Sequence, residues 1–437
     1  MKKAGQKNAF DKLMELINLG AYENQAIVDI IKEKNKLPVL TNEDIANIQK
    51  YVAQANEYQK YSREWKVNMS KAHQIAADKQ SITMGEKVVQ FARLQMLSNP
   101  RTMGRNVVGN VPLSMTEVPS DVVGSVVDWL THKKTGSQRS VTWNPHLITE
   151  AKGMGRGVKE TVLDIRDHVD TYRMGEDTVT QYEMPRGRVF KNNGGLFDRL
   201  SDGINLMDNY VKYGLMFGDR PFFEGHYDKR MAQLKDLNYD VTAPETKAKA
   251  YAYAVEMVYQ NQSTVSKAAN NMRDALNGFG LSFGIPRLGN FAVPFIQTPA
   301  NIADKVTDYY PPTALAKIVL QLGTSKNKPF DSELFARRIG RAVTGTGIVA
   351  LSYALSAAGI LTGSDDDDKD KRQAMRAAGW RPYSIKIGDT YYDYSFAQPI
   401  GMLLAISSPA RAISRSNCGG SAAVSYRCDS GQEAVCN

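Results

Sequence analysis

Apolar residues recur at helical spacing along most of this chain. The first hundred residues show the pattern in "NAFDKLMELINLG", in "NQAIVDIIKEKNKLP" and in the long polar stretch that follows Thr41. Thr41 is followed three residues later by Asp44, which predicts a helix N-terminus closed by a capping box. The helix that follows has a narrow apolar face, which is typical of helices that pack in a hairpin or bundle.

Prolines and glycines predict where later helices end. We expect breaks at Asn99-Pro100 and at Gly218-Asp219, ahead of Pro221. The stretch between Val107 and Leu130 is rich in Val and Leu but contains three carboxylates, Glu117, Asp121 and Asp128. These carboxylates argue against a membrane span and favour an interfacial or bundle helix pair.

Only one stretch carries a clear strand pattern. In "SIKIGDTYYDYS", Ile385 and Ile387 alternate with polar residues before a two-residue Gly-Asp turn. If Ile387 pairs with Thr390, one face of the hairpin carries Ile385, Ile387, Tyr392 and Tyr394. The sequence therefore predicts a mainly α chain, built as a multi-helix bundle or elongated helical array, with one small β-hairpin near 384–395.

Composition shifts divide this helical array into successive segments. We expect an N-terminal helical region (1–100), an irregular or helical linker region (101–192), a second helical region (193–277), a Gly/Pro-rich segment (278–312), helices with a candidate membrane helix (313–364), an acidic loop with the hairpin (365–412) and a Cys-containing tail without structure (413–437). The Gly/Pro-rich segment lacks acidic residues from Gly278 to Ile302, which makes it a candidate membrane-surface or re-entrant segment.

Residues 342–364 form an uncharged run that ends at four aspartates. As a helix the run is long enough to cross a bilayer core of ~30 Å. Most of its residues are Ala, Gly, Ser or Thr, which suit close helix contacts in lipid and equally suit a buried helix in a soluble assembly. Both alternatives stay open. The candidate membrane-contact residues are its larger apolar ones, Val343, Ile348, Val349, Leu351, Leu355, Ile360 and Leu361.

Composition narrows the classes of partner and compartment. The 437 residues carry a net charge of +9, but acidic residues are interleaved with the Lys and Arg, so the excess is weak support for nucleic-acid binding. All three cysteines lie in the last 20 residues, at Cys418, Cys428 and Cys436. A cysteine-free body suits a reducing compartment. The tail reads as spliced, read-through or artificially appended, because three cysteines without a nearby His do not make a zinc site.

Candidate chemistry is sparse. Asp164 and His168 are four residues apart and would share one helix face as a metal or acid–base pair, with Asp167 beside them. A solvated charged face explains the same residues without chemistry. "GMGRG" at 153–157 resembles a phosphate loop, but the buried strand that should precede it is absent, so a flexible joint between helices is the simpler interpretation. We expect no enzymatic activity, cofactor or metal.

Five phrases together carry a resemblance to a known family. In chain order they are "LPVLTNEDIANI", "LQMLSNPRTMGRNVVGN", "YGLMFGDRPFFEGHY", "PFIQTPANIADKVTDYYP" and "AAGWRPYSIKIGDTYYDYSFAQPIGMLL". With these phrases, residues 10 to 410 resemble the large polyvalent-protein-associated regions of tailed phages and prophages. Such regions sit within very long virion proteins, often beside separate enzymatic modules, and the family assigns them no catalytic residues.

The resemblance implies a virion-associated protein region that is packaged and delivered with the genome. Its localisation would be the virion and then the host cell envelope or cytoplasm. Its partners would be other virion proteins, with homo-oligomers expected, and it would engage the host membrane or form part of an ejection assembly. The alternative is a scaffold or DNA-packing module that binds nucleic acid non-specifically through the +9 charge.

Overall fold

The computed structural model describes residues 40–79, 82–172, 174, 189–190, 201–283, 287–293, 295–324 and 330–408. It confirms a mainly α chain with a single two-stranded antiparallel hairpin in this part of the sequence. The chain divides into two compact units, one formed by residues 1–107 and 146–304 and the other by residues 108–145 and 305–437. Each unit is described by itself. The predicted helices before residue 40 and the Cys-containing tail lie outside the described residues.

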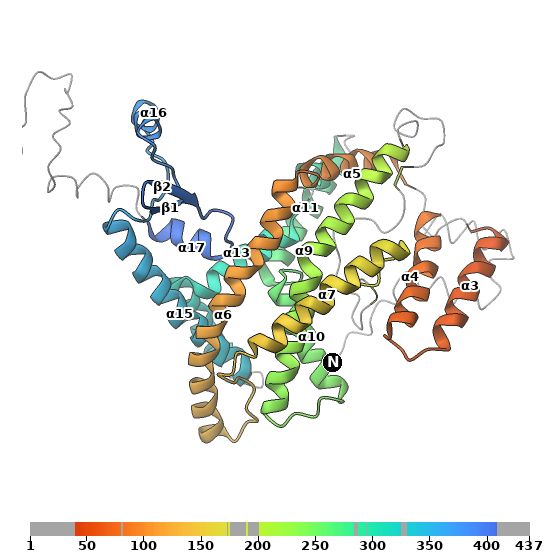
Figure 1. Ribbon diagram of the computed structural model, residues 1–437, viewed down its shortest axis with the longest axis horizontal. Helices are drawn as coiled ribbons and strands as arrows, with labels where there is room; N and C mark the ends of the chain where they lie inside the picture. The colour runs from red at the N-terminus through yellow and green to blue at the C-terminus, as the bar shows by residue number, and fades with distance from the viewer. Residues whose placement is uncertain are drawn as a thin grey trace, which may run out of the picture. The chain divides into compact units, whose positions relative to one another are not determined.

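The first unit is a set of helices, most of which are labelled in Figure 1. Its helices are α3 (Asn42–Asn56), α4 (Arg63–Asp78), α5 (Met84–Leu97), α7 (Leu147–Asp167), α9 (Ser201–Asp236), α10 (Pro244–Met257), α11 (Thr264–Ser282) and α12 (Leu288–Ala292). The capping box predicted for Thr41 and Asp44 opens α3, with both reciprocal hydrogen bonds present.

Two long helices, α7 and α9, form the most extensive helix pair of this unit and lie side by side (Figure 1). The pair is close because glycines on α7 face the α9 backbone. A Cβ at Gly157 would lie 2.6 Å from the Cα of Pro221, and one at Gly153 would lie 2.6 Å from the carbonyl oxygen of Glu224. The predicted joint at 153–157 is therefore wrong, since these glycines are inside a helix and permit helix contact.

The break predicted before Pro221 is also wrong, because α9 continues through this proline. A proline inside a helix removes one backbone hydrogen bond and usually kinks or ends the helix. Here Phe222 and Phe223, which follow it, are buried with Met216, Tyr172 and residues of α10 in one hydrophobic cluster. This burial stabilises the helix on both sides of the proline.

The second unit contains the chain's hairpin and the helices that follow residue 305. Its elements are most of α6 (Pro100–Thr135), the end of α13 (Gln297–Tyr309), α14 (Pro311–Thr324), α15 (Ser332–Ala357), α16 (Lys369–Ala377), β1 (Ser384–Ile387), β2 (Thr390–Asp393) and α17 (Ile400–Ser407). The predicted break at Asn99-Pro100 is confirmed, whereas the helix pair predicted for 107–130 is a single helix, α6.

The hairpin has the predicted register, with Ile387 opposite Thr390 and Ile385 opposite Tyr392. Gly388 occupies the turn with a φ of 61°, a conformation that glycine adopts without strain. Leu361 adds a single antiparallel bridge to Ile385. The uncharged run 342–364 is therefore not one helix, since α15 ends at Ala357 and the residues after it join the hairpin.

Alanine substitutions at two glycines of α7 should have opposite effects on protein stability. Gly157→Ala should destabilise the protein by about 1–3 kcal/mol, because the new methyl group overlaps the α9 backbone. Gly155→Ala should stabilise it by about 0.5–1 kcal/mol, because no atom lies within 4 Å of the new Cβ and alanine is the better helix former. Urea unfolding of the two variants measures both effects. Equal changes in the unfolding midpoint would contradict the close contact at Gly157.

Candidate functional site

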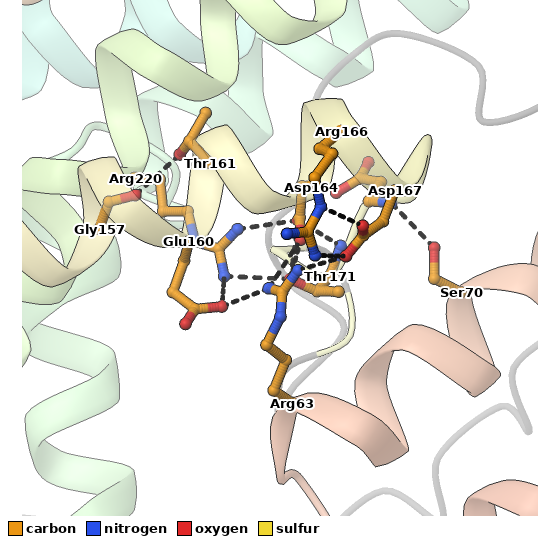
Figure 2. Close-up of polar contacts among 11 residues, drawn as sticks. Arg63, Ser70, Gly157, Glu160, Thr161, Asp164, Arg166, Asp167, Thr171 and Arg220 are labelled. Carbon is orange, nitrogen blue, oxygen red and sulfur yellow. Dashed lines mark hydrogen bonds and ion pairs between the residues drawn. The ribbon is translucent and has the colours of Figure 1, made fainter.

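The carboxylate of Asp164, near the C-terminus of α7, is the centre of a buried polar network in the first unit (Figure 2). Its Oδ1 accepts a hydrogen bond from Nη1 of Arg63 on α4 at 3.0 Å. Its Oδ2 accepts from Nη1 of Arg220 on α9 at 2.8 Å and from the backbone N–H of Thr171 at 2.8 Å. The hydroxyl of Thr171 donates to the same oxygen at 2.7 Å. Three helices and the segment after α7 therefore meet on one carboxylate.

Arg63 extends the network along the face of α7. Its guanidinium also pairs with Glu160 and, through Nη2, with Asp167 Oδ2 at 3.0 Å. Burial acts to lower the pKa of Arg63, but the hydrogen bonds and charges of Glu160 and Asp164 raise it above its usual range. One arginine from α4 thus binds three carboxylates that are spaced about one helix turn apart on α7, as Figure 2 shows.

This geometry does not provide the acid–base pair that the sequence suggested. Both oxygens of Asp164 are occupied by cationic or hydroxyl donors, so they offer no free lone pair to a proton or metal. Helix α7 ends at Asp167, and His168 follows as an exposed cap residue with a φ of 52°. Asp164 and His168 therefore do not share a helix face. No group of three or more His, Cys, Asp or Glu in the described residues has the arrangement of a metal site.

Replacement of Asp164 tests the structural importance of this network. Asp164→Asn keeps the shape of the side chain but removes the charge that Arg63 and Arg220 require, so the free energy of unfolding should fall by about 3–5 kcal/mol. Asp367→Asn, in the exposed acidic loop, should change it by less than about 0.5 kcal/mol. Chemical denaturation measures both, and equal stability of the two variants would contradict the assigned role.

A second buried carboxylate on α7, Glu150, lies beside His226 and Lys229 of α9. Nδ1 of His226 lies 3.1 Å from its Oε1, and Nζ of Lys229 lies 3.8 Å from its Oε2. Burial acts to raise the pKa of Glu150, but the contacts with His226 and Lys229 lower it below its ordinary value of 4.5.

The lowered pKa of Glu150 predicts how stability changes with pH. A carboxyl group with a depressed pKa in the folded state stabilises the fold above its unfolded pKa, and this contribution is lost as the pH falls through the folded pKa. The unfolding free energy should therefore decrease as the pH falls below about 4.5. In Glu150→Gln this decrease should be smaller, which urea titrations across the acid range will measure. An unchanged slope would contradict the assignment to Glu150.

In the second unit, the carboxylates of α6 that argued against a membrane span in residues 107–130 are buried and paired. Nε of Arg341 on α15 donates to Glu117 Oε1 at 2.9 Å, and the hydroxyl of Tyr309 donates to the same oxygen at 3.0 Å. Nη1 of Arg337 lies 3.6 Å from Asp121 Oδ1. Arg337 and Arg341, which precede the uncharged run 342–364, are therefore buried partners of α6.

The predicted membrane-contact residues do not share one environment. Val343, Leu351 and Ile360 are exposed, Ile348, Val349 and Leu355 are partly buried, and Leu361 is 2% exposed beside the hairpin. Among the residues that the structure describes, no helix combines the length and hydropathy that crossing a membrane requires.

Helix α14 carries an exposed apolar stripe that the sequence analysis did not single out. Leu315, Val319 and Leu322 follow at intervals of four and three residues and are 58%, 65% and 46% exposed. The only charged residue of this helix, Lys317, pairs with Asp308 through Nζ and Oδ1 at 2.6 Å. The spacing in "PPTALAKIVLQLGT" was the available signal, but sequence alone did not show which side of the helix faces the core.

Comparisons with family models, with curated proteins and with solved structures find no match to this chain.

Proposed function

We propose that this chain is a non-enzymatic region of a phage or prophage virion protein that is packaged with the genome and forms part of an ejection assembly. The five phrases that resemble large polyvalent-protein-associated regions suggest the class of protein. The exposed stripe of α14 is the observation that carries the assembly role, because it is apolar, regular and free of unpaired charge.

The stripe favours a helix of another virion protein as its partner. Apolar residues at intervals of four and three residues form the seam by which helices pack against each other. The outer side of α15 adds small exposed residues, including Gly347, Ala350 and Ala354, which let a neighbouring helix approach closely.

A lipid surface is a less suitable partner for these helices. Helices that lie on membranes usually carry Lys and Arg on the polar face beside the apolar one. On α14 and α15, Lys317 is paired with Asp308, Arg341 with Glu117, and Arg337 with Asp121. These cations are held by carboxylates of the same unit and are not presented to anionic headgroups.

Incorporation into particles tests the proposal. In phage particles produced from a genome that encodes this chain, mass spectrometry should detect the wild-type protein. Val319→Glu should reduce its amount per particle by about tenfold or more, since it places a charge in the centre of the stripe at little cost to the fold. Gln373→Glu adds the same charge on exposed helix α16 and should leave incorporation unchanged.

Other results would contradict specific parts of the proposal. Absence of the wild-type protein from purified particles would contradict the virion role. Equal incorporation of both variants would contradict the role of the α14 stripe. Binding of the purified chain to anionic vesicles that Val319→Glu abolishes would assign the stripe to lipid instead of a helix.

A further inference from the structure

A cavity of about 380 Å³ in the first unit combines cationic side chains with aromatic rings. It lies between the start of α4, the middle of α9 and α10, and its volume is in the range of small-molecule sites. Its cations come from all three elements and are Lys60, Lys66, Arg220 and Lys247. Its one carboxylate is that of Glu224.

Arg220 is already paired with Asp164 and Glu160, so the positive charge of the cavity is that of its three lysines. Glu224 Oε2 is already paired with Nη2 of Arg156 at 2.7 Å, outside the cavity lining. The ammonium of Lys66 makes no hydrogen bond or ion pair with the part of the chain that the structure describes, although Lys66 is partly buried. Burial lowers the pKa of Lys66, the charge of Glu224 acts to raise it, and the charge of Arg220 acts to lower it. An anionic ligand would offset the cost of this burial.

Arg220 lines the cavity and is held in place by the Asp164 network. It is 2% exposed, and its Nη atoms are used by Asp164 and by the hydroxyl of Thr171. Its Nε–H has no hydrogen-bond partner within the described residues. A buried donor without an acceptor costs about 1–3 kcal/mol, a cost that the fold carries.

The aromatic residues give the cavity a second kind of surface. Tyr227 stacks with Phe223 at an interplanar angle of 16°, and Tyr251 meets Phe223 edge-on with ring centroids 5.4 Å apart. Tyr61, Tyr227 and Tyr251 are only partly buried, so parts of their rings face the cavity. A planar aromatic ligand can stack on such rings while cations bind its charge.

We propose that this cavity binds a nucleotide unit, meaning a nucleobase with its attached phosphate. Phosphate alone would use the lysines and leave the rings unused, and an apolar ligand would leave the lysines without partners. The phosphate oxygens are placed with the lysines of the cavity, above all Lys66, and the base is placed with Tyr227 and Tyr251. The same chemistry is offered by a free mononucleotide and by a unit of single-stranded DNA.

Binding of defined probes to the full chain tests this proposal and separates the two sources. The probes are dAMP, inorganic phosphate and a fluorescent ten-nucleotide dT strand, measured by calorimetry or fluorescence anisotropy. Lys66→Met and Tyr227→Ala should each weaken binding of dAMP or the strand by roughly tenfold. Lys369→Met, at an exposed position on α16, is the matched lysine control and should not change binding.

The outcomes either support or overturn the proposal. If dAMP binds with the same affinity per site as the dT strand, the result supports a free nucleotide as the ligand. Much tighter binding of the strand, weakened by added salt, supports single-stranded DNA as long as Lys66→Met weakens it more than Lys369→Met does. Three results would each overturn the proposal. They are phosphate binding as tight as that of dAMP, binding that Lys66→Met leaves unchanged, and no binding of dAMP or the strand. Circular dichroism confirms that the variants are folded.

Discussion

Each unit of this protein depends on carboxylates that are removed from water and must be paired. Transfer of an unpaired charge into the interior costs several kcal/mol, so a buried Asp or Glu restricts which elements can pack around it. In the first unit Asp164 requires Arg63 and Arg220, which fixes α4 and α9 against α7. In the second unit Glu117 requires Arg341 and Tyr309, which fixes α15 against α6. Apolar packing fills the space that these pairs define.

The same pairing explains why local patterns were predictable and long-range roles were not. The capping box at Thr41 and the register of the 384–393 hairpin follow from residues that are neighbours in sequence, and both are present in the structure. The single helix through Glu117 was not predicted, because the local sequence suggests only solvent or lipid, and no cationic partner, around this carboxylate. Its partner Arg341 is 224 residues away, and no periodicity indicates that distance.

The glycines of α7 show the same limit of sequence-based prediction for helix packing. Gly153 and Gly157 suggest a flexible joint in the sequence, because glycine has a free backbone conformation. The sequence does not show which surface lies opposite them. The structure places α9 so close that a side chain at either position would overlap its backbone. The continuation of α9 through Pro221 follows from this contact and from the buried Phe222 and Phe223. A local rule was thus overridden by tertiary burial, which is when such rules fail.

The Asp164 network and the proposed nucleotide cavity share Arg220, and this sharing constrains how the cavity can work. Two sides of the guanidinium are held by Asp164 and Thr171, so the part of the cavity wall that Arg220 forms is set before any ligand arrives. A side chain that is already fixed loses little conformational entropy on binding, which is the advantage of preorganisation. The lysines around it are less constrained, and the ammonium of Lys66 makes no ion pair with the described residues. Asp164, whose carboxylate suggested catalysis in the sequence, therefore has a different role, because it holds an arginine that lines the cavity.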